Sequence, residues 1–227
     1  MMIQHHVADD LLLAYAAGDL DESWSLVVAT HLALCTECRV AVRHAEEVGG
    51  VLMEELEPAV VAPGALNSIM ELIDAGPTGA VQEKQHTRSE PTGSAHACAG
   101  SEIFLPEPVR TYANGDLDSL KWRSLGRGAY HIPLSAGEGM VRLLRIPAGK
   151  PVPDHSHNGR ELTLVLKGSF RDDRGTFARG DVEDCDDTVQ HQPIAGPEED
   201  CICLAVTEAP LRFKSLAARI VQPFIGI

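Results

Sequence analysis

The chain has 227 residues, of which 19 are basic and 33 acidic, so its formal charge is −14. Its content of 44% hydrophobic residues is ordinary for a folded protein and excludes disorder throughout. Residues 1–77 hold 13 acidic and 2 basic side chains, a net charge of −11, which argues against direct nucleic-acid binding and favours a basic protein partner.

The first third of the chain has a helical pattern. Residues 7–17 are expected to form a short helix that ends at Gly18. Residues 22–50 continue the helical pattern, with a break expected near Cys35. A third helix is expected to be apolar along one face, and it therefore needs a surface to pack against. The residues of that apolar face are Leu66, Ile69, Met70 and Ile73.

The amino-acid composition changes after the helical part. Residues 78–102 are rich in Gly, Ser, Thr and Ala and read as a linker. Beyond them, short apolar runs such as MVRLLRI, ELTLVL and CICLAV are separated by glycines and prolines, which indicates a β-sandwich or barrel. We therefore predict an all-α domain over residues 1–77, a flexible linker over 78–102 and an all-β domain over 103–227.

The sequence shows no signal peptide and no transmembrane segment. It has no run of 18 apolar residues, and the opening MMIQHHVADD lacks the basic and apolar regions of a signal peptide. We expect a cytoplasmic protein without membrane contact. In such a compartment the six cysteines stay reduced, and cysteines near histidines more often bind metal than form disulfides.

The segment HLALCTEC places His31, Cys35 and Cys38 at a spacing typical of metal ligands. On a helix these positions share one face, and a turn after Cys35 still allows Cys38 to close the chelate. A structural zinc site needs a fourth donor, for which His5 and His6 are the nearest candidates. His44 is less favoured, because it follows Cys38 on what should be the next helix. The alternative is that the histidine and the two cysteines only fill the core of a helical hairpin.

With His6 as the fourth donor, this pattern in a short acidic helical domain resembles the zinc-binding anti-sigma (ZAS) family. The resemblance implies that His6, His31, Cys35 and Cys38 bind Zn²⁺. It also implies that the domain wraps a group IV (extracytoplasmic-function, ECF) sigma factor in a 1:1 complex and covers its polymerase-binding surfaces. The net charge of −11 agrees with a partner that carries basic surfaces.

The stretch GKPVPDHSHNGRELTLVLKG carries a second set of metal-ligand residues. On a strand His155 and His157 share one face, and Glu161 on the next strand can add an inward donor. The stretch matches the first motif of the cupin family, and Gly180 and His191 keep the glycine-to-histidine separation of the second motif, although the turn between them departs from it. Cupins are double-sheet jelly rolls. We expect a second divalent metal on the three histidines and Glu161, with zinc favoured, although iron, manganese, nickel and copper suit the same donors.

A ZAS domain fused to a cupin is similar to the ChrR anti-sigma factors, and the resemblance covers nearly the whole chain except the linker. The fold class is therefore multidomain, with a small all-α zinc-binding domain followed by an all-β jelly-roll domain. The resemblance implies that the helical domain inhibits the sigma factor. It also implies that the cupin is needed to release the sigma factor in response to singlet oxygen or related oxidants, and that the chain is not an enzyme.

Three cysteines of the β domain leave two interpretations open. Cys201 and Cys203 are expected to face the same side of one strand, and they and Cys185 are most simply small buried residues. The functional alternative is oxidant sensing beside the metal, which requires an accessible thiolate.

Two other functions remain as alternatives. One is a metal-dependent cupin enzyme, such as an oxygenase, in which the helical part is a docking module. The other is a sensor of zinc supply. The identity of the cupin metal and any oxygen-dependent turnover would separate the enzyme from the regulator.

Overall fold

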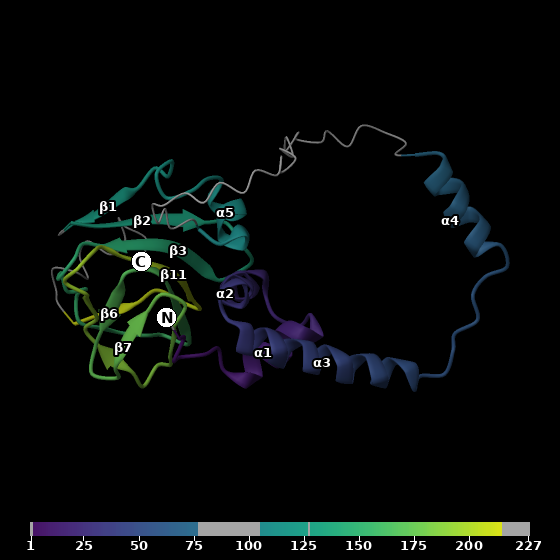
Figure 1. Cartoon of the computed structure of the whole chain (residues 1–227), viewed down its shortest axis with the longest axis horizontal. Coiled ribbons are helices and arrows are strands. Elements are labelled where there is room, and N and C mark those ends of the chain that lie inside the picture. The colour runs from purple at the N-terminus through teal and green to yellow at the C-terminus, as the bar shows by residue number, and fades with distance from the viewer. Residues whose placement is uncertain (1, 77–104, 127, 215–227) are drawn as a thin grey trace. The chain divides into compact units, whose positions relative to one another are not determined.

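The computed structural model describes residues 2–76, 105–126 and 128–214 (Figure 1). The predicted linker, Cys98 and the closing VQPF segment lie outside these ranges. Five helices are described: α1 (Asp9–Ala17), α2 (Glu22–Leu34), α3 (Thr36–Glu54), α4 (Ala65–Asp74) and α5 (Glu107–Ala113).

The first three helices follow the predicted pattern. Helix α1 ends at Gly18, which has the left-handed φ of 72° that ends many helices. Helix α2 begins after Asp21, whose carboxylate accepts a hydrogen bond from the Ser23 backbone N–H. The chain turns at Cys35, as predicted, and α3 then starts in a new direction, bent by 119° from α2.

Within the described ranges, twelve strands form three antiparallel sheets. Their bounds are β1 (Arg123–Gly126), β2 (Ala129–Leu134), β3 (Met140–Ile146), β4 (His155–Ser156), β5 (Glu161–Lys167), β6 (Ser169–Arg171), β7 (Thr176–Ala178), β8 (Val182–Cys185), β9 (Gln190–His191), β10 (Ile194–Ala195), β11 (Cys201–Thr207) and β12 (Arg212–Phe213). The largest sheet has the order β1-β2-β3-β11-β5-β8, and the smaller ones are β10-β6-β7 and β12-β4-β9. The prediction of many short strands is therefore confirmed.

The N-terminal helices and the strands share one hydrophobic core. Helix α2 is buried on nearly all sides and lies against β11 and β5, at one end of the strands labelled β3 and β11 in Figure 1. Its Val27 and Val28 are fully buried in the same cluster as Leu204 and Val206 of β11. Each such side chain contributes about 1.5–3 kcal/mol when it leaves water. This packing holds the end of α2 against the strands.

Residues up to Val51 form one compact unit with the strand region, and a second unit begins at Leu52 and contains α4. The functional boundaries at residues 77 and 102 stay a prediction. The short helix α5 was not expected from the sequence. Within the described ranges no single helix is both long and apolar enough to cross a membrane, and the one helix pair that passes such a test together is the bent pair α2 and α3.

Candidate metal centres

The corner between α2 and α3 gathers one set of donor atoms. His31 lies in the last turn of α2, Cys35 at the corner, Cys38 in the first turn of α3, and His6 in the segment before α1. Their donor atoms all lie within 4.8 Å of one another. His31 Nε2 is 3.2 Å from Cys38 Sγ, and His6 Nδ1 is 3.3 Å from Cys35 Sγ and 3.5 Å from Cys38 Sγ.

These separations fit a zinc ion. Tetrahedral ligands at about 2.1 Å (nitrogen) and about 2.3 Å (sulfur) lie roughly 3.3–3.8 Å apart. Burial lowers the pKa of His31 to about 4, so its imidazole is neutral and able to coordinate. Burial, with the neighbouring Cys35 thiol, raises the pKa of Cys38 to about 12, so a thiolate there requires a cation. The donor set is chemically that of a closed zinc site.

The structure distinguishes the two N-terminal histidines. His6 reaches the cluster, whereas His5 points to the strand region, where its ring lies 4.4 Å from that of Phe177. The Nδ1 atom of His5 is 3.7 Å from an Asp181 carboxylate oxygen. His6 is therefore the histidine placed to be the fourth donor.

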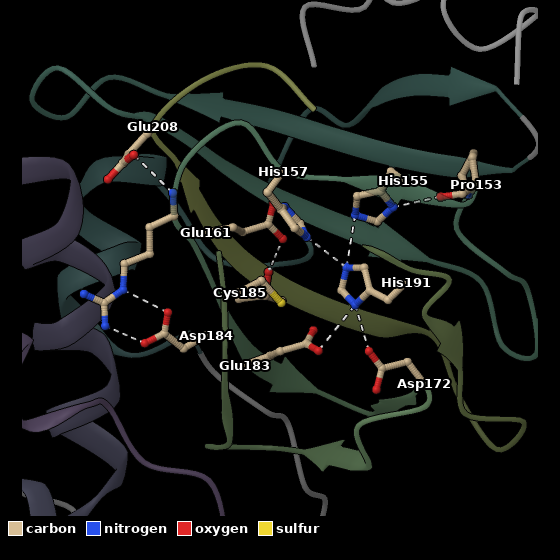
Figure 2. Close-up of polar contacts among 12 residues, drawn as sticks. Pro153, His155, His157, Glu161, Asp172, Glu183, Asp184, Cys185, His191 and Glu208 are labelled. Atoms are coloured by element: carbon tan, nitrogen blue, oxygen red, sulfur yellow. Dashed lines mark hydrogen bonds and ion pairs between the residues drawn. The ribbon is translucent and has the colours of Figure 1, made fainter. Parts of the chain in front are cut away.

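A second set of donors lies among the strands, where three histidine side chains point toward one another (Figure 2). His155 is on β4 and His191 on β9, and these two residues are directly paired in the sheet. His191 Nε2 is 3.2 Å from His155 Nε2 and 3.3 Å from His157 Nε2. The Nδ1 atom of His155 lies 2.8 Å from the Pro153 carbonyl oxygen, which can only accept, so Nδ1 carries the proton and Nε2 is free to coordinate.

Glu161 lies beside this trio rather than within it. Its Oε2 is 3.3 Å from Nδ1 of His157, the nitrogen that faces away from His191, and its Oε1 accepts a hydrogen bond from the Thr163 hydroxyl. Burial alone would raise the pKa of Glu161, but His157 and His155 lower it, so the carboxylate is held charged. The structure thus brings three of the four predicted donors together and leaves Glu161 in contact with the other side of one of them.

Two carboxylates that were not predicted from the sequence stand behind His191. Its Nδ1 lies 2.7 Å from Asp172 Oδ2 and 3.4 Å from Glu183 Oε1, as Figure 2 shows. Burial would lower the pKa of His191, but these carboxylates raise it to about 9. Such outer partners fix the orientation of a metal-binding imidazole and make it a better donor. Glu183 could have been suspected from the sequence, because it lies two residues before Cys185 and therefore on the same face of strand β8. Nothing in the sequence around Asp172 indicates its role.

His155 and His191 line a mostly apolar cavity. Cys201 and Cys203 line it from β11, on the same face as predicted, with their sulfur atoms 3.5 Å apart. Contact with Cys201 and burial raise the pKa of Cys203 well above its usual value. Burial likewise raises the pKa of Cys185. All three thiols are buried, which agrees with their interpretation as small buried residues.

Comparison with known proteins agrees with the architecture. Residues 111–210 match the family described as ChrR Cupin-like domain. The anti-sigma-E factor ChrR of Cereibacter sphaeroides is 46% identical over 228 residues, which cover 100% of both chains. A crystal structure of Rhodobacter sphaeroides SigE in complex with the anti-sigma ChrR matches 91% of this chain and 99% of its own, with 43% identity and a TM-score of 0.74. The helical region followed by a cupin was therefore predicted correctly, and the chain belongs to the ChrR family of anti-sigma factors.

Proposed function

We propose that this protein binds a group IV (ECF) sigma factor as a 1:1 complex and inhibits it through the helical domain of residues 1–77. The observation that carries the proposal is the identity of 46% over the whole length of a relative named as an anti-sigma factor. A solved relative bound to its sigma factor supports the same partner class. The acidic character of residues 1–77 suits a basic partner in the cytoplasm.

The docking surface of this proposal is apolar. The last turns of α3 and the loop after it expose Val48, Val51, Leu52, Met53 and Leu56 by 57–73%. Helix α4, described by itself, buries none of its residues and exposes Leu66, Ile69, Met70, Leu72 and Ile73. Apolar patches of this kind mark protein interaction sites. We infer that the sigma factor covers them.

In this proposal His6, His31, Cys35 and Cys38 hold a Zn²⁺ ion. Zinc supplies a structural cross-link there and no catalysis, because all four positions are filled by the chain. The link would join the segment before α1 to the corner of α2 and α3. It would thereby fix the direction in which α3 presents its apolar end.

We further propose that the cupin holds a second divalent metal, zinc, and that it releases the sigma factor in response to singlet oxygen or related oxidants. The donors are His155, His157, His191 and Glu161, of which Glu161 must turn its carboxylate from Nδ1 of His157 toward the trio. A signal can release the partner only if the altered state binds it less tightly.

One observation favours an alternative, a metal-dependent cupin enzyme. His155 and His191 border a cavity with largely apolar walls, as in sites that take organic ligands. These walls include Leu144, Ile146 and Phe170. Iron in the purified protein together with oxygen-dependent turnover would establish that alternative. Zinc without turnover is the result expected for the regulator.

The docking surface can be tested by charge substitution. Leu52→Asp in the full chain is expected to weaken binding of the partner sigma factor by at least tenfold, because it buries an unpaired charge. Leu13→Asp on α1 is the matched control, since Leu13 is 61% exposed and Leu52 60%. Equal loss in both variants, or no loss in either, would contradict the proposed surface.

A further inference from the structure

The strand region contacts the first metal cluster directly. The Nδ1 atom of His31 lies 2.9 Å from the carbonyl oxygen of Gly180, in the turn before β8. A carbonyl oxygen only accepts, so Nδ1 carries the proton and Nε2 is the free nitrogen that faces Cys38. His31 is fully buried, so no water can replace this partner. Gly180 therefore sets both the tautomer and the orientation of a zinc-site histidine.

The next residue holds the chain just before His6. One carboxylate oxygen of Asp181 accepts hydrogen bonds from the backbone N–H groups of Gln4 (2.7 Å) and His5 (2.9 Å). The backbone N–H of Val182 donates to the His5 carbonyl oxygen at 3.0 Å. Three consecutive residues, Gly180–Val182, thus position His31 and the chain before His6. We call residues Gly180–Val182 the docking segment.

The packing around the docking segment is too close for a larger residue. Gly180 has a φ of +95°, and a Cβ placed on it would lie 2.6 Å from Cδ1 of Ile3. Only glycine is free of strain with this backbone and this neighbour. The close contact between the docking segment and the N-terminal segment therefore depends on both Gly180 and Ile3.

Strand β8 begins with Val182, the last residue of the docking segment, and its next residues contact the surroundings of both clusters. Glu183 points inward to His191 of the second cluster. Asp184 binds the guanidinium of Arg160 (2.6 Å), which also binds Asp10 of α1 (2.6 Å). Arg160 itself precedes Glu161. The same short strand therefore connects the surroundings of one cluster to those of the other.

We propose that the docking segment makes metal retention in the His6, His31, Cys35 and Cys38 cluster depend on the cupin. The inference rests on the zinc site of the proposed function and adds its regulation. When the strand region is intact, Gly180 and Asp181 hold His31 and the His6 segment ready for the metal. When that region is disturbed, the cluster loses its outer partners and its metal affinity falls. By linkage, metal in the cluster stabilises the docked arrangement to the same extent.

Cobalt provides a readout specific to this cluster in a Cys185→Ser background, because the donor atoms of Cys185, Glu183 and His191 also lie within 4.8 Å of one another and could hold a metal. Co²⁺ bound to cysteine thiolates has a sulfur-to-metal charge-transfer absorption that a site of histidines and a carboxylate lacks. The full chain is loaded with Co²⁺, and the loss of this absorption is followed during titration with a chelator. Asp181→Asn replaces one acceptor oxygen with a donor, so at least one of the backbone N–H groups of Gln4, His5 and Ala178 loses its partner. Because Asp181 holds the segment before His6 and does not contact a ligand itself, we expect the apparent affinity to fall by roughly tenfold, the lower end of the range for direct outer partners of metal ligands.

Two further variants distinguish coupling between the cupin and the first cluster from a general loss of stability. Ile3→Ala leaves the strand region unchanged and is expected to lower the affinity in the same direction by a smaller factor. Asp200→Asn is the matched control, because Asp200 accepts a backbone N–H from Ala148 and binds Arg145 within the cupin. It is expected to titrate like the unaltered chain.

The outcomes separate the inference from the function on which it rests. No charge-transfer absorption in the unaltered chain would overturn the metal site and the coupling together. A normal absorption with the same chelator titration in all variants would overturn the coupling and leave the site. Equal weakening by Asp200→Asn and Asp181→Asn would also overturn it, because the effect would then be general destabilisation.

Discussion

Asp172 gives the sharpest test of the second metal centre. Its side chain is 1% exposed, and its carboxylate lies 2.7 Å from Nδ1 of His191. Asp172→Asn keeps the size of the side chain but removes the charge that makes the imidazole a strong donor. Loss of such an outer partner lowers metal affinity by about 10–100-fold, or about 1.4–2.7 kcal/mol. We expect the lower end of this range, because Glu183 Oε1 lies 3.4 Å from the same nitrogen.

The assay is a zinc competition with a chelator in a Cys38→Ser background, which removes the first cluster from the measurement. Asp173→Asn is the matched control, since Asp173 is the exposed neighbour of Asp172. If Glu183 substitutes for Asp172, the double variant Asp172→Asn/Glu183→Gln should lose more affinity than the two single losses combined. Unchanged affinity in both Asp172→Asn and the double variant would refute the role assigned to these carboxylates.

Three further predictions concern the rest of the fold. Cys38→Ser should remove one zinc per chain and lower the melting temperature, as metal analysis and calorimetry would detect; unchanged zinc content would contradict the first site. Leu204→Ala, in the fully buried centre of β11, should lower the free energy of unfolding by about 2–5 kcal/mol in urea titration, and a loss below 1 kcal/mol would contradict the shared core. Burial would raise the pKa of Asp181 above 3.8, but hydrogen bonds from three backbone N–H groups lower it. Its contribution to stability is therefore fully present above that ordinary value and is lost as the pH falls through the lowered one. The protection of the Gln4 and His5 amides from exchange, relative to the unfolded chain at the same pH, should fall only in strong acid, and a fall near neutral pH would contradict this.

The helices and the donor residues could be predicted from local signals. Helix α1 ends at Gly18 because glycine readily takes the left-handed backbone conformation found there. Helix α2 ends at Cys35, where the backbone becomes extended. The spacing of His31, Cys35 and Cys38 reflects the geometry of a helix and its corner. These features need no knowledge of distant parts of the chain.

The surroundings of both clusters depend on tertiary contacts and could not be predicted. Asp172 meets His191 only because the strands bring positions 19 residues apart together. Gly180 meets His31 across 149 residues. The sequence indicated a helical domain and a separately folded β domain, whereas α2 lies against β11 and β5. Its burial on nearly all sides has one sequence signal, the long apolar run LVVATHLAL, but that run does not identify the partner surface.

If this chain inhibits a sigma factor by binding it, light scattering of the purified mixture will detect the complex. The metal-loaded full chain is mixed with its partner ECF sigma factor, and core RNA polymerase is then added. We expect a 1:1 complex and no association of that sigma factor with the polymerase. Two separate proteins in the mixture, or a sigma factor that joins the polymerase as readily as when it is alone, would show that the chain does not inhibit the sigma factor by binding it.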